Sequence, residues 1–455
     1  MKKNVSILFC VLGLAFFSIG NAQNPECPQN LSIFAGHAKV KNYDAAYEPW
    51  KMVYENCPTL HWATYHYGER ILKHKIESDP ANKAEYVNML TELYATSYKN
   101  FPDRYNETGS LIDQALLLND YKLGTDEEIY QILDKAFKNN PEEFKNAKAL
   151  YLYFSKLVDL HDAGKKELQE VFDTYDHVTG KIAEENQEIG ETIVRYLEKE
   201  EAGTLTSKEE KVLAAVRKNG ENYEKISGSI DAKLGKLADC DNLIPLYQKN
   251  FEARKGDAEW LKSAAGRMDA KGCAGDPLFV KMVEALDQIE PSASSKYYLG
   301  SLYDEQGDIT KAFEFYKQSV DLETDPVKKA KKLTNLSSKA AKRGRKSEAR
   351  KYANEALQLN PAGGTPYLIL ASLYANSAND CGGTAFEKRA MYWKAAQTAR
   401  RAGQVDPSLS SKAASAAASY EGRAPSKTDI FSSGMAGKTI QFNCWVGGSI
   451  TVPSL

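Results

Sequence analysis

Apolar residues recur along most of the chain with the spacing that places them on one face of an α-helix. One clear example follows Thr125, because a threonine with Glu128 three residues later is typical of a helix N-terminus. Apolar positions then fall three or four residues apart, at Ile129, Ile132, Leu133, Ala136 and Phe137. Asn140-Pro141 predicts the end of this helix. Segments of this kind dominate the chain, so the sequence predicts an all-α fold.

A second capping pattern runs from Ser207 to Glu210 and predicts another helix N-terminus. Gly220 predicts the end of the helix that follows, since glycine commonly terminates helices. Just before it, Glu200-Glu201-Ala202-Gly203 predicts a turn between two longer helices.

The last residues change character. From Thr439 to Val446 apolar and polar residues alternate, which is the pattern of a β-strand. Gly447-Gly448 predicts a two-residue hairpin turn, and the alternation continues to Val452. Because a lone hairpin is only marginally stable in water, we expect it to pack on the helices as a small cap.

The helical segments after Pro291 repeat one pattern. Its residues are Leu299, Gly300, Tyr303, Gly307, Ala312 and Tyr316. Two later segments, Ala349–Pro361 and Ala395–Pro407, end with identical spacing of three alanines and a proline. A third unit begins at Gly364 and is interrupted over 377–389. Such self-similarity predicts stacked helical hairpins, in which small residues let two helices approach closely.

These spacings resemble the tetratricopeptide-repeat family, and the resemblance is clearest over 293–407. Near the amino end, Tyr43, Ala46, Trp50 and Pro58 match the second half of the same pattern. The resemblance implies a solenoid of helical hairpins with a concave side. We therefore expect the following parts: a signal peptide (1–22), tetratricopeptide-like hairpins (23–141), an irregular α-helical array (142–290), tetratricopeptide repeats (291–407), and a helix with the β-hairpin cap (408–455).

In that family the first helix of each repeat lines a partner groove. Carried over to this sequence, the groove positions are Ser294, Tyr297, Ser301, Asp304, Lys331, Thr334, Ser338 and Ala341. They do not reproduce the paired Lys, Asn and Arg with which the family's best-known groove clamps a carboxyl-terminal peptide. The resemblance thus implies a protein or peptide partner and leaves its identity open.

The first residues predict export. Lys2 and Lys3 precede a short apolar run from Ile7 to Ile19, and Gly20-Asn21-Ala22 offers small residues for cleavage after Ala22. Cys10 is preceded by Phe9 inside the apolar run, so the sequence does not favour a lipid anchor. No later stretch is long and apolar enough to span a bilayer, and we expect a soluble mature chain.

Removal of the signal peptide would leave six of the seven cysteines. In an exported protein an even number favours disulfides, although six cysteines allow 15 connectivities. We expect pairing in chain order: Cys27–Cys57, Cys240–Cys273 and Cys381–Cys444. The alternative is that some are free buried thiols.

Overall charge is balanced, with 59 Lys and Arg against 61 Asp and Glu, which argues against a nucleic-acid partner. One segment departs from this balance: Lys328–Lys351 holds eleven Lys or Arg and only Glu348 as an acid. It could attract an anionic partner, lipid head groups or lipopolysaccharide. The alternative is a solvated face of two helices whose apolar residues turn inward: Leu333, Leu336, Ala349 and Ala353.

No pattern predicts a catalytic, cofactor-binding or metal site. His66, Arg70 and His74 share a helix face, but an arginine occupies the slot where a metal site would need a ligand. The run from Gly434 to Thr439 resembles the end of a phosphate-binding loop, yet Ser432 replaces the first glycine and a strand follows.

Taken together, the sequence predicts an exported scaffold or adaptor, without enzymatic activity, that binds another protein in a cell-envelope assembly. We expect it in the periplasm or associated with the outer membrane. The alternatives are an α-helical glycan-binding protein of the outer membrane and an enzyme hidden in the 142–290 array.

Overall fold

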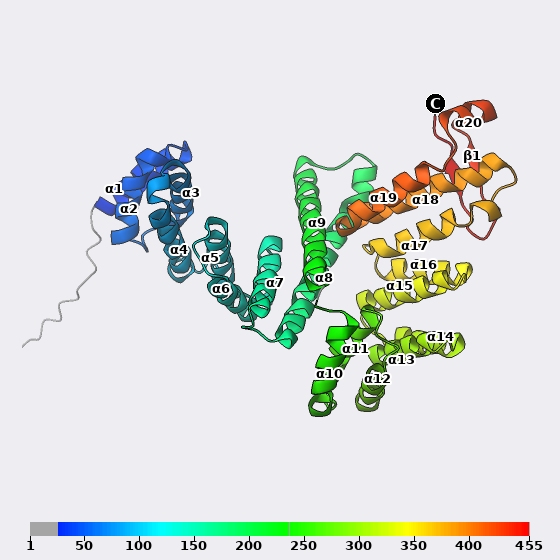
Figure 1. Ribbon diagram of the computed structural model, residues 1–455. Helices are drawn as coiled ribbons and strands as arrows, with labels where there is room; N and C mark the ends of the chain where they lie inside the picture. Colours follow the sequence, from blue (N-terminus) through cyan, green and yellow to red (C-terminus); the bar gives the residue numbers. More distant parts are fainter. Residues whose placement is uncertain (1–25, 236, 455) are drawn as a thin grey trace, which may run out of the picture. The chain divides into compact units, whose positions relative to one another are not determined.

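The computed structural model of the chain describes residues 26–235 and 237–454, and the predicted signal peptide lies outside them. Over these ranges the chain is α-helical apart from one two-stranded sheet near the carboxyl end, as the sequence predicts (Figure 1). It divides into two compact units between Phe144 and Lys145. No helix in the described ranges is long and apolar enough to cross a membrane.

The described part of the first unit, residues 26–144, consists of three helical hairpins. Their helices are α1 (Glu26–Lys39) and α2 (Tyr43–Asn56), α3 (Ala63–Ser78) and α4 (Lys83–Asn100), and α5 (Glu107–Tyr121) and α6 (Asp126–Asn139), with short 3₁₀ turns η1 (Pro80–Asn82) and η2 (Pro141–Glu143). The capping box predicted at Thr125 and Glu128 is present at the start of α6, and α6 ends before Pro141. Trp50 is fully buried and donates its indole N–H to the Thr64 carbonyl oxygen at 2.8 Å.

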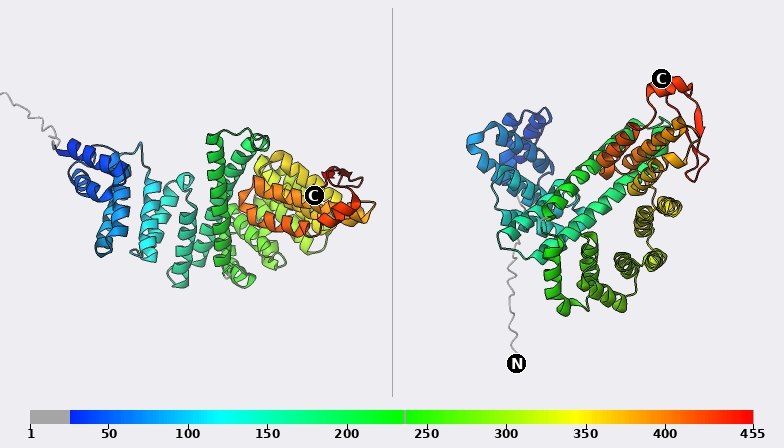
Figure 2. Two further views of the ribbon diagram at one scale, coloured as in Figure 1. Left: turned by 90° about the horizontal axis from the view of Figure 1, so that it is seen from above. Right: turned by 45° about the vertical axis from the view of Figure 1, so that its right-hand side comes forward.

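The second unit begins with three helices that do not follow the repeat. They are α7 (Ala147–Asp162) and two long helices, α8 (Leu168–Glu201) and α9 (Ser207–Leu234), joined by the turn expected after Glu200. Buried apolar residues recur along α8, among them Ile182, Ile189 and Ile193. Figure 2 shows α8 and α9 running side by side over their length.

Two sequence predictions about α9 were wrong. Thr206, not Ser207, caps the helix, because the Thr206 side chain accepts the Glu209 N–H and the Glu209 carboxylate accepts the Thr206 N–H. Gly220 does not end the helix but lies inside it. A Cβ added at Gly220 would be 2.5 Å from the Pro407 Cβ, so this glycine permits close contact with a distant turn.

We expect Thr206→Ala to lower the free energy of unfolding by about 1 kcal/mol, because it removes the cap of α9. Hydrogen–deuterium exchange over the first turn of α9 would show the change locally. Ser207→Ala is the matched control, since Ser207 is exposed and lies next to the cap. Equal effects of the two variants would contradict the assignment.

The rest of the unit is built mainly of stacked hairpins. After α10 (Cys240–Arg254) come four pairs: α11 (Ala258–Ala270) with α12 (Pro277–Ile289), α13 (Ala293–Glu305) with α14 (Ile309–Leu322), α15 (Pro326–Lys342) with α16 (Lys346–Leu359), and α17 (Gly364–Ala375) with α18 (Ala385–Val405). The interruption within the last pair holds a 3₁₀ turn, η3 (Ala378–Asp380).

The glycines of the repeat allow close helix packing and tight turns. A Cβ on Gly300 would lie 2.5 Å from the Tyr316 ring, so only glycine lets α13 and α14 pack this closely. Gly307 and Gly344 stand at equivalent turns with φ of 81° and 72°, a left-handed conformation that glycine adopts without strain. Ala312, Ala349 and similar small residues are fully buried between the helices.

The chain closes with η4 (Pro407–Leu409), α19 (Ser410–Glu421), α20 (Lys427–Ser433) and the sheet of β1 (Thr439–Gln441) and β2 (Ser449–Thr451). The strands are antiparallel, with Ile440 opposite Ile450. The sequence predicts a longer hairpin, with a strand over 439–446 and a two-residue turn, and this extent was wrong. The last strand pair is Gln441 with Ser449, and residues 442–448 form a loop between them. The intervening loop is held elsewhere: Cys444 is disulfide-bonded, and the Arg350 guanidinium donates to the Trp445 carbonyl oxygen.

The sheet packs on the last repeats, as expected of a cap. Ile440, Phe442, Val446 and Val452 are buried in one cluster with residues of α17 and α18. The described residues form three disulfides, and they are the pairs of the chain-order prediction: Cys27–Cys57, Cys240–Cys273 and Cys381–Cys444. The last of these joins the interruption near η3 to the loop of the sheet.

Candidate binding cleft in the second unit

The long helix α8 packs where the third hairpin meets the fourth, although these elements are far apart in sequence. The side-chain amides of Gln187 and Asn360 form a mutual pair, with Asn360 Nδ2 donating to Gln187 Oε1 at 2.8 Å. Gly190 permits close approach, since a Cβ there would lie 2.8 Å from the Ala362 Cβ. Further along α8, Glu201 pairs with Arg401. Figure 2 (right) shows α10–α18 curving away from α8 and returning to it.

The other end of α8 is anchored by one buried arginine. Arg267 of α11 is 6% exposed and donates to the Phe172 carbonyl oxygen at 3.1 Å, to the Asp176 carboxylate and to the Tyr247 hydroxyl. Burial raises the pKa of Asp176 above its ordinary value, and the Arg267 charge opposes that shift. The array of hairpins is therefore bridged by α8 at both ends.

Between α8 and the hairpins lies an open cleft of about 420 Å³. One wall is α8, with Ala183, Asn186 and Gln187, and the opposite wall is the start of α15, with Lys331 and Thr334 among its residues. The floor comes from the ends of α16 and α17 and from the η4 turn. Elements separated by more than a hundred residues thus form one site.

The cleft contains polar groups that have no partner within the described chain. The Asn186 Oδ1 is buried and accepts no hydrogen bond. Lys328 and Lys331 also line the cleft and form no ion pair with the described residues. Burial lowers the pKa of the adjacent Lys332, and the positive charges of Lys262 and Lys331 add to this effect. The two lysines therefore allow the cleft to accept negative charge.

Only some of the predicted groove residues line the cleft. Lys331 and Thr334 line the cleft, whereas Tyr297, Ser301 and Asp304 are engaged within the array. Ser301 donates to Asp269, and Asp304 pairs with Lys339 at 3.0 Å and with Arg343 at 2.7 Å. The Tyr297 ring packs against Tyr316, with Lys332 5.9 Å from its centroid.

The remaining three carried-over positions lie outside the cleft lining. Ser294 and Ser338 are half-buried, and Ala341 packs against the core of the array. Of the eight carried-over groove positions, Lys331 and Thr334 therefore line this cleft.

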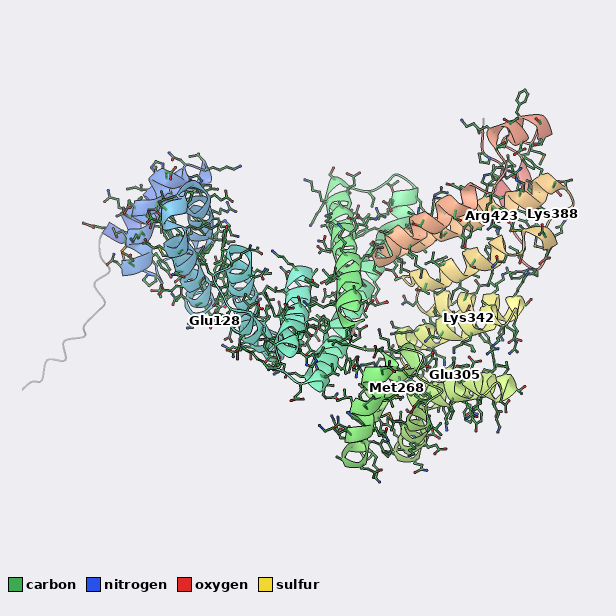
Figure 3. The ribbon with its side chains drawn as sticks, in the orientation of Figure 1. Glu128, Met268, Glu305, Lys342, Lys388 and Arg423 are labelled. Atoms are coloured by element: carbon green, nitrogen blue, oxygen red, sulfur yellow. A yellow bond between two sulfur atoms is a disulfide. The ribbon has the colours of Figure 1, made fainter. Side chains whose placement is uncertain are left out.

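The basic segment Lys328–Lys351 is mostly used to join helices. Ion pairs of its residues bind α15 to α13 and α16 to η3, the latter through Lys346 and Asp380 at 2.8 Å. Its apolar residues Leu333 and Leu336 are buried, as the alternative of a solvated helix face expects. Four of its lysines form no ion pair with the described residues: Lys328, Lys329, Lys331 and Lys342. The first three cluster at the start of α15, and Lys342 stands at its far end (Figure 3).

The histidines of the first unit do not gather into a metal site. The His74 Nε2 lies 3.2 Å from an Asp44 carboxylate oxygen, and its ring packs beside Tyr43. Burial lowers the pKa of His66, and Arg70 adds to this effect. In the two described ranges no cluster of His, Cys, Asp and Glu could hold a metal ion.

Sequence reasoning missed the α8 wall of the cleft. Asn186 and Gln187 lie in the stretch assigned only as an irregular helical array, and no repeat relates them to Lys331. One available signal was the length of the apolar periodicity over 168–201, which is too long for a single repeat helix.

No protein-family model matches the chain, and no curated protein sequence matches it. Among solved structures it is similar to a tetratricopeptide repeat protein from Parabacteroides merdae (12% identity, covering 66% of this chain and 94% of that chain, TM-score 0.25). It is also similar to yeast Tom70 (12% identity, covering 89% of this chain and 82% of that chain, TM-score 0.27). A third similar structure is Naa15/Naa10 bound to HypK-THB (13% identity, covering 87% of this chain and 66% of that chain, TM-score 0.25). The hairpins and glycine contacts of the chain itself define its fold, a tetratricopeptide-like array of helical hairpins with a small carboxyl-terminal sheet.

Proposed function

We propose that this chain is an exported adaptor that binds a segment of another protein in the cleft between α8 and α15. The observation that carries the proposal is the pair of ammonium groups in that cleft, those of Lys328 and Lys331, which form no ion pair with the described residues. A ligand segment that carries negative charge gains affinity from these two groups.

A polypeptide segment suits these groups. Its acidic side chains or terminal carboxylate can approach the two lysines. Thr334 lies on the same wall as Lys331, although its own hydroxyl donates to the Ala330 carbonyl oxygen at 2.7 Å. Because both walls are helices fixed at their ends, the site is formed before the ligand arrives, which lowers the entropy lost on binding.

The disulfides support export. All six cysteines of the described residues are paired, and disulfides persist in oxidising compartments. We place the protein in the periplasm or at the outer membrane, as part of an envelope assembly. The signal peptide on which this placement also depends is a prediction from the sequence.

Glycan binding is the alternative function, and it would need exposed aromatic side chains. Many tyrosines instead lie in the core, including Tyr65, Tyr247 and Tyr316. The cleft itself is lined by amides, lysines, small residues and the Asp406 carboxyl, and among the described residues its lining holds no aromatic ring, which favours a protein ligand over a sugar ring.

We expect a photo-crosslinking amino acid at position 334 to capture one reproducible partner protein in intact cells. Lys331→Glu in the same chain should reduce the yield about ten-fold, because it reverses a charge inside the cleft. Lys342→Glu is the matched control, since Lys342 is an unpaired lysine at the other end of α15, and it should leave the yield unchanged. Capture of no reproducible partner, or an equal loss of cross-linking yield with both variants, would contradict the proposal.

A further inference from the structure

One edge of the hairpin array exposes aliphatic side chains at equivalent positions. The last residue of the second helix is Ile289 in the first of the four hairpins, Leu322 in the second and Leu359 in the third, and all three are exposed. Val327, at the start of α15, is exposed beside them and also lines the cleft. A single exposed aliphatic residue needs no explanation, but recurrence at one repeat position forms a row.

The fourth hairpin shows what covers this position. Its equivalent residue, Val405, is only 1% exposed, and α8 lies next to it. A Cβ on Gly190 of α8 would lie 3.2 Å from the Val405 carbonyl oxygen. The chain therefore already places a helix on this edge once, next to Val405, and leaves Ile289, Leu322, Val327 and Leu359 exposed.

The charges at the exposed edge select an acidic helix. Lys328, Lys329 and Lys331 stand at the start of α15 without an ion pair to any described residue. The part of α8 that covers the fourth hairpin, residues 183–201, is itself acidic, with seven glutamates against Arg195 and Lys199. Gln187, Gly190 and Glu201 share the face of α8 that meets the array.

We propose that the edge formed by Ile289, Leu322, Val327 and Leu359, with the three lysines, binds an acidic amphipathic helix of a partner protein. The partner helix lies along the first three hairpins as α8 lies on the fourth, with aliphatic residues on the row and carboxylates near the lysines. This inference rests on the proposed adaptor function and names the chemistry of the partner segment that continues beyond the cleft.

A fluorescent peptide with the sequence of residues 183–201 is the probe, because it is acidic and amphipathic and its own site in the full chain is occupied by α8. We expect it to bind the full chain in an anisotropy titration, and a scrambled peptide of the same composition to bind about ten-fold more weakly. Leu322→Ser should weaken binding of the 183–201 peptide about ten-fold, because it removes an apolar anchor. Leu123→Ser, which changes an equally exposed leucine (46% against 49%), should not.

The charge contribution is tested separately. Lys329→Glu should weaken peptide binding, and Lys342→Glu should leave it unchanged. Failure of the peptide to bind, or equal binding to the Leu322 and Leu123 variants, would overturn the proposal. Association with phosphatidylglycerol vesicles in place of the peptide would also overturn it, and would assign the edge to a membrane surface.

The two proposals can fail separately. If peptide binding is lost only with Lys331→Glu and not with Leu322→Ser, the peptide occupies the cleft, and the edge proposal is wrong while the adaptor function stands. If cross-linking from position 334 captures no partner in cells, the adaptor function fails whatever the peptide does.

Discussion

Arg267→Met should lower the free energy of unfolding of the second unit by about 3–5 kcal/mol, the largest effect we expect from a single substitution. The buried guanidinium joins the Phe172 carbonyl oxygen and the Tyr247 hydroxyl to the Asp176 carboxylate, whose side chain is 37% exposed. Methionine fills a similar volume but leaves the Asp176 carboxylate without its cation. Urea unfolding followed by circular dichroism would measure the loss.

The stability lost in Arg267→Met should depend on pH in a defined direction. Burial already raises the pKa of Asp176, and removal of Arg267 should raise it further. A carboxyl whose pKa is higher in the folded state favours the fold when it is protonated, so the loss should shrink as pH falls. We expect a smaller difference between variant and wild type at about pH 5 than at about pH 8.

Arg267→Lys serves as the control, since it keeps the positive charge and loses only part of the hydrogen bonding. It should lower the free energy of unfolding less than Arg267→Met does, and this loss should vary less with pH. A loss that is the same for both variants and independent of pH would show that Arg267 acts by packing alone.

Gly190→Leu should detach α8 from the fourth hairpin. We expect it to lower the free energy of unfolding by about 3 kcal/mol, because the added side chain overpacks the contact. The added side chain would meet the Ala362 Cβ and the Val405 carbonyl oxygen at the end of α18. Hydrogen–deuterium exchange should rise over the second half of α8 and over 360–366. Partner capture from position 334 should fall as well, because one wall of the cleft is displaced.

Gly180→Leu is the matched control for this substitution. Gly180 lies on the same helix, and a Cβ there would meet no atom within 4 Å. Both variants replace a helical glycine and gain similar helix propensity, so they differ only in the contact. If Gly180→Leu raised exchange at 360–366 as much as Gly190→Leu, the packing of α8 on the fourth hairpin would not explain the result.

The repeats were predictable because the residues that define them are close in sequence. Gly300 and Tyr316 lie in one hairpin, so their spacing alone encodes their contact. The capping box at Thr125 is equally local. Chain-order disulfides followed for the same reason, since Cys27 and Cys57 flank neighbouring helices.

What the sequence could not show depends on distant partners. Gly220 was interpreted as a helix end because nothing near it reveals Pro407, which occupies the space beside it. Ser301 and Asp304 were carried over as groove residues, but Asp269 and Lys339 of neighbouring helices engage them. The cleft joins Asn186 to Lys331, and no repeat or motif relates those positions.

The central claim is that α8 faces α15 across a cleft that a partner segment can enter. A photo-crosslinking amino acid at position 183, on the α8 wall, tests it directly in the purified full chain. Mass spectrometry should find intramolecular adducts with residues 327–335 of α15, and these should disappear when a bound partner fills the cleft. Adducts only with α7 or α9 would contradict the account.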